Sequence, residues 1–440
     1  MAKGGRKTIR IGLLGCGNVG AALSSLLTDP VGQATLIERA GVSVELVAIG
    51  VNDLTKRRSD QSWFPSHLLT KDLVGIVARE DVDVIVELLG GIEPAGSLIT
   101  AALESGKAVV SANKALLAER GVTLERLAES KAVDLAYEAA VAGAIPIIRT
   151  LRESLAGEEI YRVMGIVNGT TNFILSKMTA EGLAYDDAIE QAQRLGYAEH
   201  DPSADVEGYD AAAKAAILAG LAFDATIGLE QVHCEGITKL RSIDLAYASK
   251  MGYSVKLLAI AERRGDGASV RVHPAMLPLS HPLASVDEAM NAVFVEGAAS
   301  GPIMLYGQGA GGMATASAVL GDLIDVARNQ VAGTFRAPPR RHASLAAISM
   351  TDLVSEFYLS LDVADEPGVL AKVADVFGSH GVSIRSMEQS GLGDEARLVF
   401  LTHAALERDV AATMEALNGL REVDAIGGVI RVVGDEQGDR

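Results

Sequence analysis

The chain contains few cysteines and few aromatic rings. Of its 440 residues only Cys16 and Cys234 are cysteines, and aromatic residues make up 4%. Two cysteines cannot form a disulfide framework or a cysteine-based metal site, so the composition fits a protein of the reducing cytoplasm. Because aromatic rings are scarce, the hydrophobic cores must be built from Ala, Val, Leu and Ile, in a chain that is 49% apolar and therefore globular.

Basic residues are scarce relative to acidic ones. The chain has 39 Lys and Arg against 57 Asp and Glu, a net charge of −18. Nucleic acids and anionic membranes bind basic surfaces, so this charge argues against both as partners, although a local basic pocket for a phosphorylated cofactor remains compatible. No apolar run approaches the ~20 residues of a membrane span. The length allows two or three domains.

The N-terminal part has the pattern of a dinucleotide-binding unit. Residues 8–14 predict a buried strand, a G-x-G-x-x-G motif follows, and residues 21–27 predict a helix. Glycines let the backbone approach a pyrophosphate, and the helix N-terminus offers unpaired N–H groups. The flanking strand and helix make the motif more specific than glycines alone. The residues expected to contact the cofactor are Gly15, Gly17, Asn18, Val19 and Gly20.

The end of the next predicted strand, residues 44–51, bears on cofactor preference. A NAD site usually has an acid there to hold the ribose hydroxyls. Here Asn52 and Asp53 are followed by a basic run at residues 56–58, in which Arg57 is the expected contact. The run could neutralise a 2′-phosphate and favours NADP, or use of both cofactors. A solvated loop explains the same residues equally well.

Two further predicted strands lead into polar loops. The first strand, residues 83–89, is followed by Gly90, and the second, residues 109–112, leads into Lys114. Ligands of open α/β sheets bind at the carboxyl ends of the strands. A lysine after a strand is commonly a surface residue, but at this position we expect Lys114 to face the cofactor crevice.

The stretch from Gly196 to Leu218 concentrates carboxylates and one lysine around an alanine-rich run. Asp210 and Lys214 are four residues apart, which places them on one face of a helix with the acid first, the better orientation for an ion pair. A solvated pair is the ordinary interpretation. The apolar residues 215–218 predict burial instead, where a lysine needs carboxylate partners. Such a lysine can donate a proton to an oxygen that gains negative charge.

Three segments together resemble a known family. They are SANKAL at residues 111–116, GIVNGTTNFIL at residues 165–175, and residues 196–218. Their order resembles homoserine dehydrogenase over about residues 8–330, and the C-terminal part resembles the longer bacterial form. The resemblance implies an oxidoreductase that interconverts L-homoserine and L-aspartate 4-semialdehyde with NADP or NAD, in threonine, methionine and isoleucine biosynthesis.

The resemblance also implies roles for individual residues. Lys214 would exchange a proton with the substrate oxygen, and Lys114 would contact both cofactor and substrate. Gly196 and Gly311 would lie beside the cofactor. The expected substrate ligands are Glu199, Asp205, Asp210 and Lys114. Two residues depart from the family pattern, His200 and Ala314, and neither removes a functional group.

A cation site is implied by the resemblance alone. Glu138 and the main-chain carbonyls of Val141, Gly143 and Ile145 would hold a monovalent cation such as sodium, which prefers oxygen ligands. Taken by itself, Glu138 is equally well interpreted as a capping acid beside a buried strand and turn. Residues 168–172 predict a polar loop, and His233, His273 and His281 lack metal-ligand spacing.

The whole chain predicts an α/β protein of three domains. A Rossmann-type domain covers residues 1–140 and is completed by residues 306–330, whose glycine-rich start precedes a helix. An α/β domain for substrate binding and dimerisation covers residues 141–305, and a proline-containing linker covers residues 331–350.

Residues 351–436 predict a ferredoxin-like strand–helix–strand–strand–helix–strand order. This order resembles an ACT domain, a module that binds amino acids at subunit interfaces. The expected ligand end contains Asp365 and Gly368. The resemblance implies an amino-acid effector, with threonine expected as the pathway product, and a homo-oligomer, either a dimer or a tetramer.

Two other functions remain open from the sequence. A non-catalytic sensor would combine a Rossmann domain that binds a nucleotide with an ACT domain that binds an amino acid. Asp210 and Lys214 argue against it, because a sensor needs no proton donor at the cofactor. A dehydrogenase of another amino-acid semialdehyde is the nearer alternative, since a fold does not determine its substrate.

Overall fold

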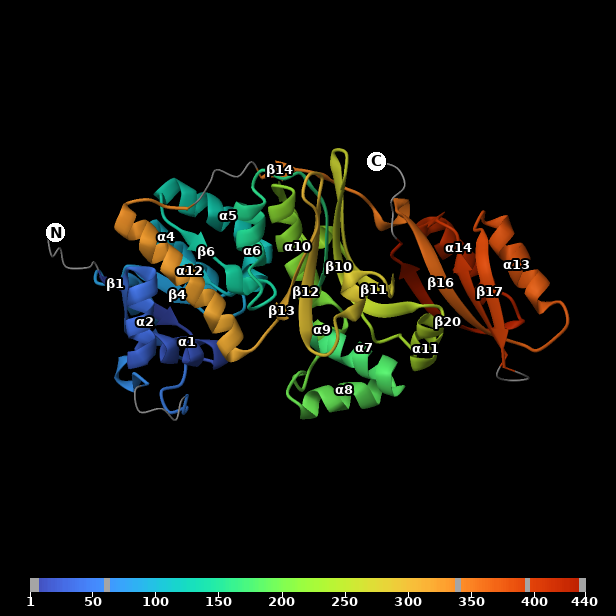
Figure 1. Ribbon diagram of the computed structural model, residues 1–440, viewed down its shortest axis with the longest axis horizontal. Coiled ribbons are helices and arrows are strands. Elements are labelled where there is room, and N and C mark those ends of the chain that lie inside the picture. Colours follow the sequence, from blue (N-terminus) through green and yellow to red (C-terminus); the bar gives the residue numbers. More distant parts are fainter. Residues whose placement is uncertain (1–7, 59–63, 337–341, 392–395, 435–440) are drawn as a thin grey trace.

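The computed structural model describes residues 8–58, 64–336, 342–391 and 396–434. It is elongated, with the N-terminal domain at one end, the C-terminal domain at the other and a second α/β domain between them (Figure 1). None of the helices in these ranges is both long and apolar enough to span a bilayer.

The N-terminal domain is built on a six-stranded parallel sheet. The strand order is β3-β2-β1-β4-β5-β6, the doubly wound order of a dinucleotide-binding domain, which confirms the predicted fold. The predicted strands appear at nearly the expected positions because buried parallel strands are continuous apolar runs. The strands are β1 Thr8–Leu14, β2 Ser43–Gly50, β3 Leu69–Thr70, β4 Val84–Glu87, β5 Ala108–Ser111 and β6 Leu135–Ala136.

Helices cover both faces of this sheet. One of them comes from far along the chain: α12 (Gly312–Ala332) packs against α1 (Asn18–Thr28). Its buried residues recur at three- and four-residue spacing, as on the apolar face of an amphipathic helix. The other helices are α2 Pro30–Ala40, α3 Leu73–Ala78, α4 Ala95–Glu104 and α5 Lys114–Lys131.

The second domain contains an antiparallel sheet in the order β13-β12-β7-β10-β11. Helices α7 (Gly169–Glu181), α10 (Tyr209–Ala222) and α11 (Ser242–Lys250) pack on it, and α8 (Tyr185–Arg194) packs on α7. The strands are β7 Ile160–Ile166, β10 Tyr253–Arg264, β11 Gly267–Pro278, β12 Met290–Gly297 and β13 Gly301–Gln308.

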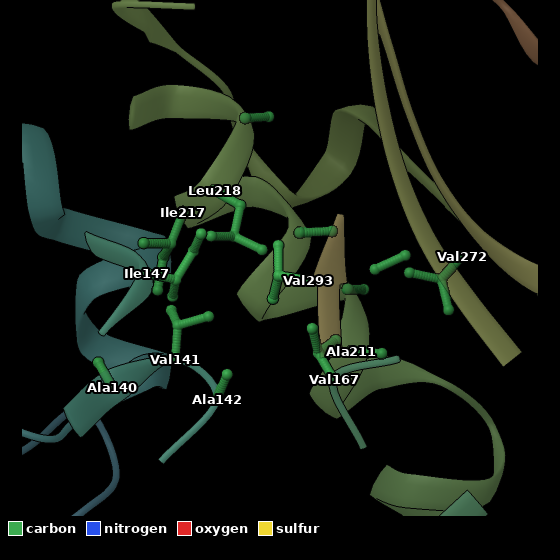
Figure 2. Close-up of a cluster of buried hydrophobic side chains, with 14 of the residues drawn as sticks. Ala140, Val141, Ala142, Ile147, Val167, Ala211, Ile217, Leu218, Val272 and Val293 are labelled. Carbon is green, nitrogen blue, oxygen red and sulfur yellow. The ribbon is translucent and has the colours of Figure 1, made fainter. Parts of the chain in front are cut away.

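Helix α10 is the most deeply buried helix of this domain. Every residue from Asp210 to Ala219 is buried, because α10 lies between the sheet on one side and α5 of the N-terminal domain on the other. Figure 2 shows Ile217 and Leu218 of this helix between Ile147 on one side and Val293 on the other. A helix that is apolar all round is expected to be enclosed on all sides.

The prediction of a polar loop at residues 168–172 is wrong. Only Asn168 precedes the helix; Gly169 begins α7 and the next three residues form its first turn. Asn168 is the N-cap, and its Oδ1 accepts a hydrogen bond from Thr171 N at 2.9 Å. Polar residues at the start of a helix resemble a loop in sequence because capping uses the same side chains as turns.

The C-terminal domain has the predicted ferredoxin-like fold. Its sheet has the order β20-β16-β18-β17, and α13 and α14 lie against it. The elements are β16 Val354–Val363, α13 Val369–Ser379, β17 Ile384–Ser390, β18 Arg397–Thr402, α14 Glu407–Asn418 and β20 Val423–Val432.

The sheet of the C-terminal domain continues into the second domain. β20 pairs in parallel with β11, with Ala275 opposite Arg431, so the two sheets form one. Two short strands before β16 also attach to the second domain, β14 (Ala343–Ser344) to β8 (Ala225–Thr226) and β15 (Ala346–Ala347) to β11. The predicted linker prolines, at positions 338 and 339, lie outside the described residues.

Candidate active site

The buried helix α10 presents a lysine and an aspartate at the domain boundary. Asp210 and Lys214 are 6% and 8% exposed. Lys214 Nζ donates to Asp210 Oδ2 and to the main-chain oxygen of Val167, both at 2.6 Å. The helical spacing therefore pairs them as predicted, and the lysine compensates its burial with two strong acceptors.

A second lysine reaches the same carboxylate from the N-terminal domain. Lys114, the first residue of α5, forms an ion pair with Asp210 Oδ1. Burial alone would raise the pKa of Asp210, but the ammonium groups of Lys214 and Lys114 outweigh it and hold that pKa well below its usual range. Asp210 thus favours its charged form and pairs with two lysines from two domains.

Asn168 links this aspartate to a third acidic residue. Its Nδ2 donates to Asp205 Oδ1 at 2.7 Å and to Asp210 Oδ2 at 2.9 Å. Burial raises the pKa of Asp205, and the neighbouring Asp210 charge raises it further. Asn168 is a site residue that sequence reasoning missed; the signal was an asparagine, a preferred N-cap residue, shortly before the apolar residues 173–175.

Glu199 does not join this cluster. It lies with Gly196 in an exposed loop after α8, and in the described part of the chain its carboxylate makes no hydrogen bond or ion pair with the groups above. The loop is attached to α7, because Thr170 Oγ1 donates to the main-chain oxygen of Tyr197 at 2.6 Å. His200 is exposed beside it; hydrogen bonds from Ser203 lower the pKa of the neighbouring Asp201, and His200 lowers it further.

The glycine-rich turn between β1 and α1 has the geometry of a pyrophosphate site. A Cβ on Gly15 would lie 2.5 Å from Leu88 O, and one on Gly20 would lie 2.3 Å from Gly15 O. A Cβ on Gly17 would meet nothing within 4 Å, so this glycine leaves open space beside the helix N-terminus. These are the roles of close packing and ligand approach that such glycines serve.

The basic run lines the cavity beside this turn. The cavity is about 640 Å³, and it is lined among others by Asn18, Lys56, Arg57 and Arg58. Arg58 folds over the turn, with Nε donating to Cys16 O at 3.2 Å. The run is therefore held at the cofactor end of the domain rather than in a distant loop.

Hydrogen bonds link the loops that follow β4 and β5. Glu87 is fully buried; it accepts hydrogen bonds from Leu89 N at 2.7 Å and Ser111 Oγ at 2.7 Å. Asn113 Nδ2 donates to Gly91 O at 2.7 Å. Sequence reasoning missed Glu87, which fixes the loop that contains Gly90.

Gly311 comes from a distant part of the chain to the neighbourhood of the glycine-rich turn. It has φ +127° directly before α12. A Cβ on its neighbour Gly312 would lie 3.2 Å from Asn18 O. The N-terminus of α12 thus lies against the glycine-rich turn.

Comparisons with known proteins agree with this geometry. Family models described as homoserine dehydrogenase, as the NAD binding domain of homoserine dehydrogenase and as the ACT domain match residues 146–324, 15–138 and 357–422. Homoserine dehydrogenase of Corynebacterium glutamicum is 47% identical over 438 residues, with 98% of this chain and 97% of the relative covered. The Mycobacterium tuberculosis (H37Rv) enzyme is 48% identical over 442 residues, covering 98% and 99%. The chain belongs to the homoserine dehydrogenase family.

Solved structures of homoserine dehydrogenases agree. The enzyme from Thiobacillus denitrificans superposes with a TM-score of 0.91 at 40% identity, covering 98% of this chain and 99% of that one. A hyperthermophilic archaeal homoserine dehydrogenase in complex with NADPH has a TM-score of 0.61 at 29% identity, covering 73% of this chain and 98% of that one. The predictions of an oxidoreductase with a nucleotide cofactor and an ACT domain are confirmed.

The expected cation ligands of the homoserine dehydrogenase fold fit only in part. Glu138 is buried, and its carboxylate accepts from Ile148 N at 2.8 Å and Arg149 N at 2.9 Å, where it caps the short helix α6 (Ile147–Arg149). Ile145 O accepts from Ile147 N. Among the described residues, nothing donates to the carbonyls of Val141 and Gly143. These two carbonyls are therefore the uncommitted oxygen ligands.

The expected effector residues of the ACT domain lie at the start of α13. Gly368 has φ +91° and directly precedes the helix, and Asp365 lies in the exposed turn before it. A glycine suits this position because the left-handed conformation strains other residues.

Proposed function

We propose that this enzyme interconverts L-homoserine and L-aspartate 4-semialdehyde with Lys214 as the proton donor in aldehyde reduction and the acceptor in alcohol oxidation. The observation that carries the proposal is that the buried Asp210 pairs with the buried Lys214 and with the exposed Lys114, which brings two ammonium groups to the boundary between the nucleotide domain and the second domain.

The hydrogen bonds of Lys214 support this role. An ammonium group has three N–H donors. Two are used by Asp210 and Val167 O, and within the described residues the third has no acceptor and is available to the substrate oxygen. The bound nicotinamide would supply or accept the hydride. Positive groups aimed at an oxygen that becomes an alkoxide stabilise the transition state, and Lys114 adds to this charge.

Acidic groups would hold the amino end of the substrate. Asp205 has one oxygen hydrogen-bonded to Asn168 at 2.7 Å, which leaves its second oxygen for the substrate ammonium. Asp210 would position Lys214 and contribute to substrate binding. The prediction that Glu199 also binds substrate requires its exposed loop to approach the cluster when substrate is present.

The experiment is turnover of Lys214→Ala with homoserine, followed by cofactor absorbance with NAD and NADP in parallel. General acid–base catalysis is typically worth about 10²–10⁴-fold, and turnover should fall on that scale while cofactor affinity is kept. Lys214→Arg should not restore activity, because a guanidinium group keeps its proton. Near-normal turnover of Lys214→Ala would move the assignment to Lys114.

The cofactor preference, the amino-acid effector and the monovalent cation are also part of the proposal. The basic run beside the glycine-rich turn supports NADP preference. The ACT domain supports regulation by an amino acid, with threonine as the effector of an oligomeric enzyme in threonine, methionine and isoleucine biosynthesis. The uncommitted carbonyls of Val141 and Gly143 support binding of a monovalent cation such as sodium. Turnover that is equal with sodium and with a bulky organic cation would contradict the cation proposal.

A further inference from the structure

A buried arginine joins the C-terminal domain to the second domain. Arg431 of β20 is 8% exposed and lies between two carboxylates. Its Nε donates to Glu407 Oε1 at 2.7 Å, and Glu407 belongs to the same domain, at the start of α14. Its Nη1 and Nη2 each donate at 2.8 Å to Glu235 of the second domain. Figure 1 shows β20 beside β11 at this junction.

Glu235 is held by hydrogen bonds to both oxygens of its carboxylate and to its main-chain N–H. It directly follows β9 (Val232–Cys234), which pairs with β11, and its N–H donates to Val272 O at 2.8 Å. Burial alone would raise the pKa of Glu235, but hydrogen bonds from His233 and Arg431 outweigh it and lower the pKa below its usual range. The ion pair with Arg431 and the backbone hydrogen bond to Val272 therefore fix the position of Glu235 and of the residues that follow it.

Those next residues lie directly against the chain that follows Asp205. Ile237 N donates to Val206 O at 2.8 Å. A Cβ on Gly236 would lie 2.2 Å from the same oxygen, so the two backbones are in contact and only a glycine fits. On the other side of Glu235, Cys234 Sγ donates to Glu207 O at 3.3 Å.

We propose that Glu235 and Arg431 are positioning residues for the substrate turn, defined as residues 205–208. Through this ion pair the C-terminal domain would hold the Asp205 carboxylate where the substrate ammonium binds. The inference rests on the proposed role of Asp205. Because Arg431 belongs to the domain proposed to bind the effector, the pair also gives the effector a physical route to substrate affinity.

The test is steady-state kinetics of Glu235→Gln and Arg431→Met in the full-length enzyme. A misplacement of about 1 Å can cost up to about 10²-fold, so a partial shift of the turn should raise the KM for homoserine about tenfold. The KM for the cofactor and kcat should change less than the KM for homoserine, because Lys214 keeps its hydrogen bonds to Asp210 and Val167 O.

Asp362→Asn is the matched control. It also removes an ion pair between the two domains, since Asp362 Oδ2 accepts from Arg241 Nη1 at 2.8 Å, but within the described residues Arg241 makes no hydrogen bond or ion pair with the substrate turn. The homoserine KM of this variant should stay at the wild-type value. A rise equal to that in Arg431→Met would overturn the proposal, because loosened docking of the C-terminal domain would then explain both.

Asp205→Asn separates this inference from the proposed function. If Asp205→Asn raises the homoserine KM while Glu235→Gln and Arg431→Met do not, the positioning role is overturned and the substrate role stands. If Asp205→Asn has no effect, the substrate role fails and this inference fails with it. Should Arg431→Met not fold, Glu235→Gln alone decides, since it keeps the side-chain shape and leaves Arg431 paired with Glu407.

Discussion

Replacement of Asn168 by aspartate tests what the hydrogen bonds of this side chain to Asp205 and Asp210 do for the substrate. The amide has two tasks: Oδ1 caps α7 through Thr171 N, and Nδ2 donates to Asp205 and Asp210. Asn168→Asp keeps an oxygen for the cap, since aspartate caps as well as asparagine. It replaces the donor with an oxygen that faces two carboxylates.

The size of the effect follows from the two lost hydrogen bonds. A hydrogen bond to a charged group contributes about 1.5–3 kcal/mol, and the new carboxylate adds like-charge repulsion. Loss of one such interaction with Asp205 corresponds to a drop of about 10- to 100-fold in kcat/KM for homoserine. The cap is retained, but a buried carboxylate that faces two others should also lower the melting temperature, as the loss of buried hydrogen bonds does in the control below.

The assay is kcat/KM for homoserine, with cofactor affinity and thermal unfolding measured on the same samples. The matched control is Asn172→Asp, four residues after Asn168 in the first turn of α7. Asn172 Nδ2 donates only to main-chain oxygens, those of Val286, Glu288 and Met290. That variant should lower the melting temperature and leave kcat/KM nearly unchanged. Wild-type kcat/KM in Asn168→Asp would refute the reasoning, because the bridge would then do nothing for the substrate.

Three further predictions concern the cofactor, pH and regulation. Alanine at both Arg57 and Arg58 should raise the KM for NADP more than that for NAD; equal changes would mean that the basic run is only a solvated loop. Lys114→Ala removes a cation that lowers the pKa of Asp205, so that pKa should rise and the loss of homoserine binding on acidification should begin at a higher pH than in the wild type. A plot of homoserine KM against pH with an unshifted midpoint would count against this. Asp365→Ala should lose threonine inhibition in a threonine titration, and an unaltered inhibition curve would remove Asp365 from the effector site.

Much of the fold followed from local pattern. The apolar runs at residues 8–14 and 44–51 predicted parallel strands because such strands are buried on both faces, and both appear within one residue of the expected bounds. The ferredoxin-like order of the C-terminal domain followed from alternation and turn residues. Helix α10 and its ion pair followed from a four-residue spacing and the apolar residues after it.

Other features of the site lie outside any local pattern. The spacing of Asp210 and Lys214 could not show that Lys114 reaches the same carboxylate, since that contact depends on how α5 packs against α10. Asn168 looked like a loop residue, because caps and turns use the same side chains.

The amino-acid sequence by itself determined the strands, the helices and the residue types needed for dehydrogenase chemistry, because periodicity and glycine placement act over a few neighbouring residues. Only the tertiary structure decided which of those residues meet. Lys114 and Asp210 are joined across two domains, and Glu235 and Arg431 are joined by a sheet that runs from β11 into β20. Contacts between residues so far apart in the chain depend on packing and burial, which no local spacing encodes.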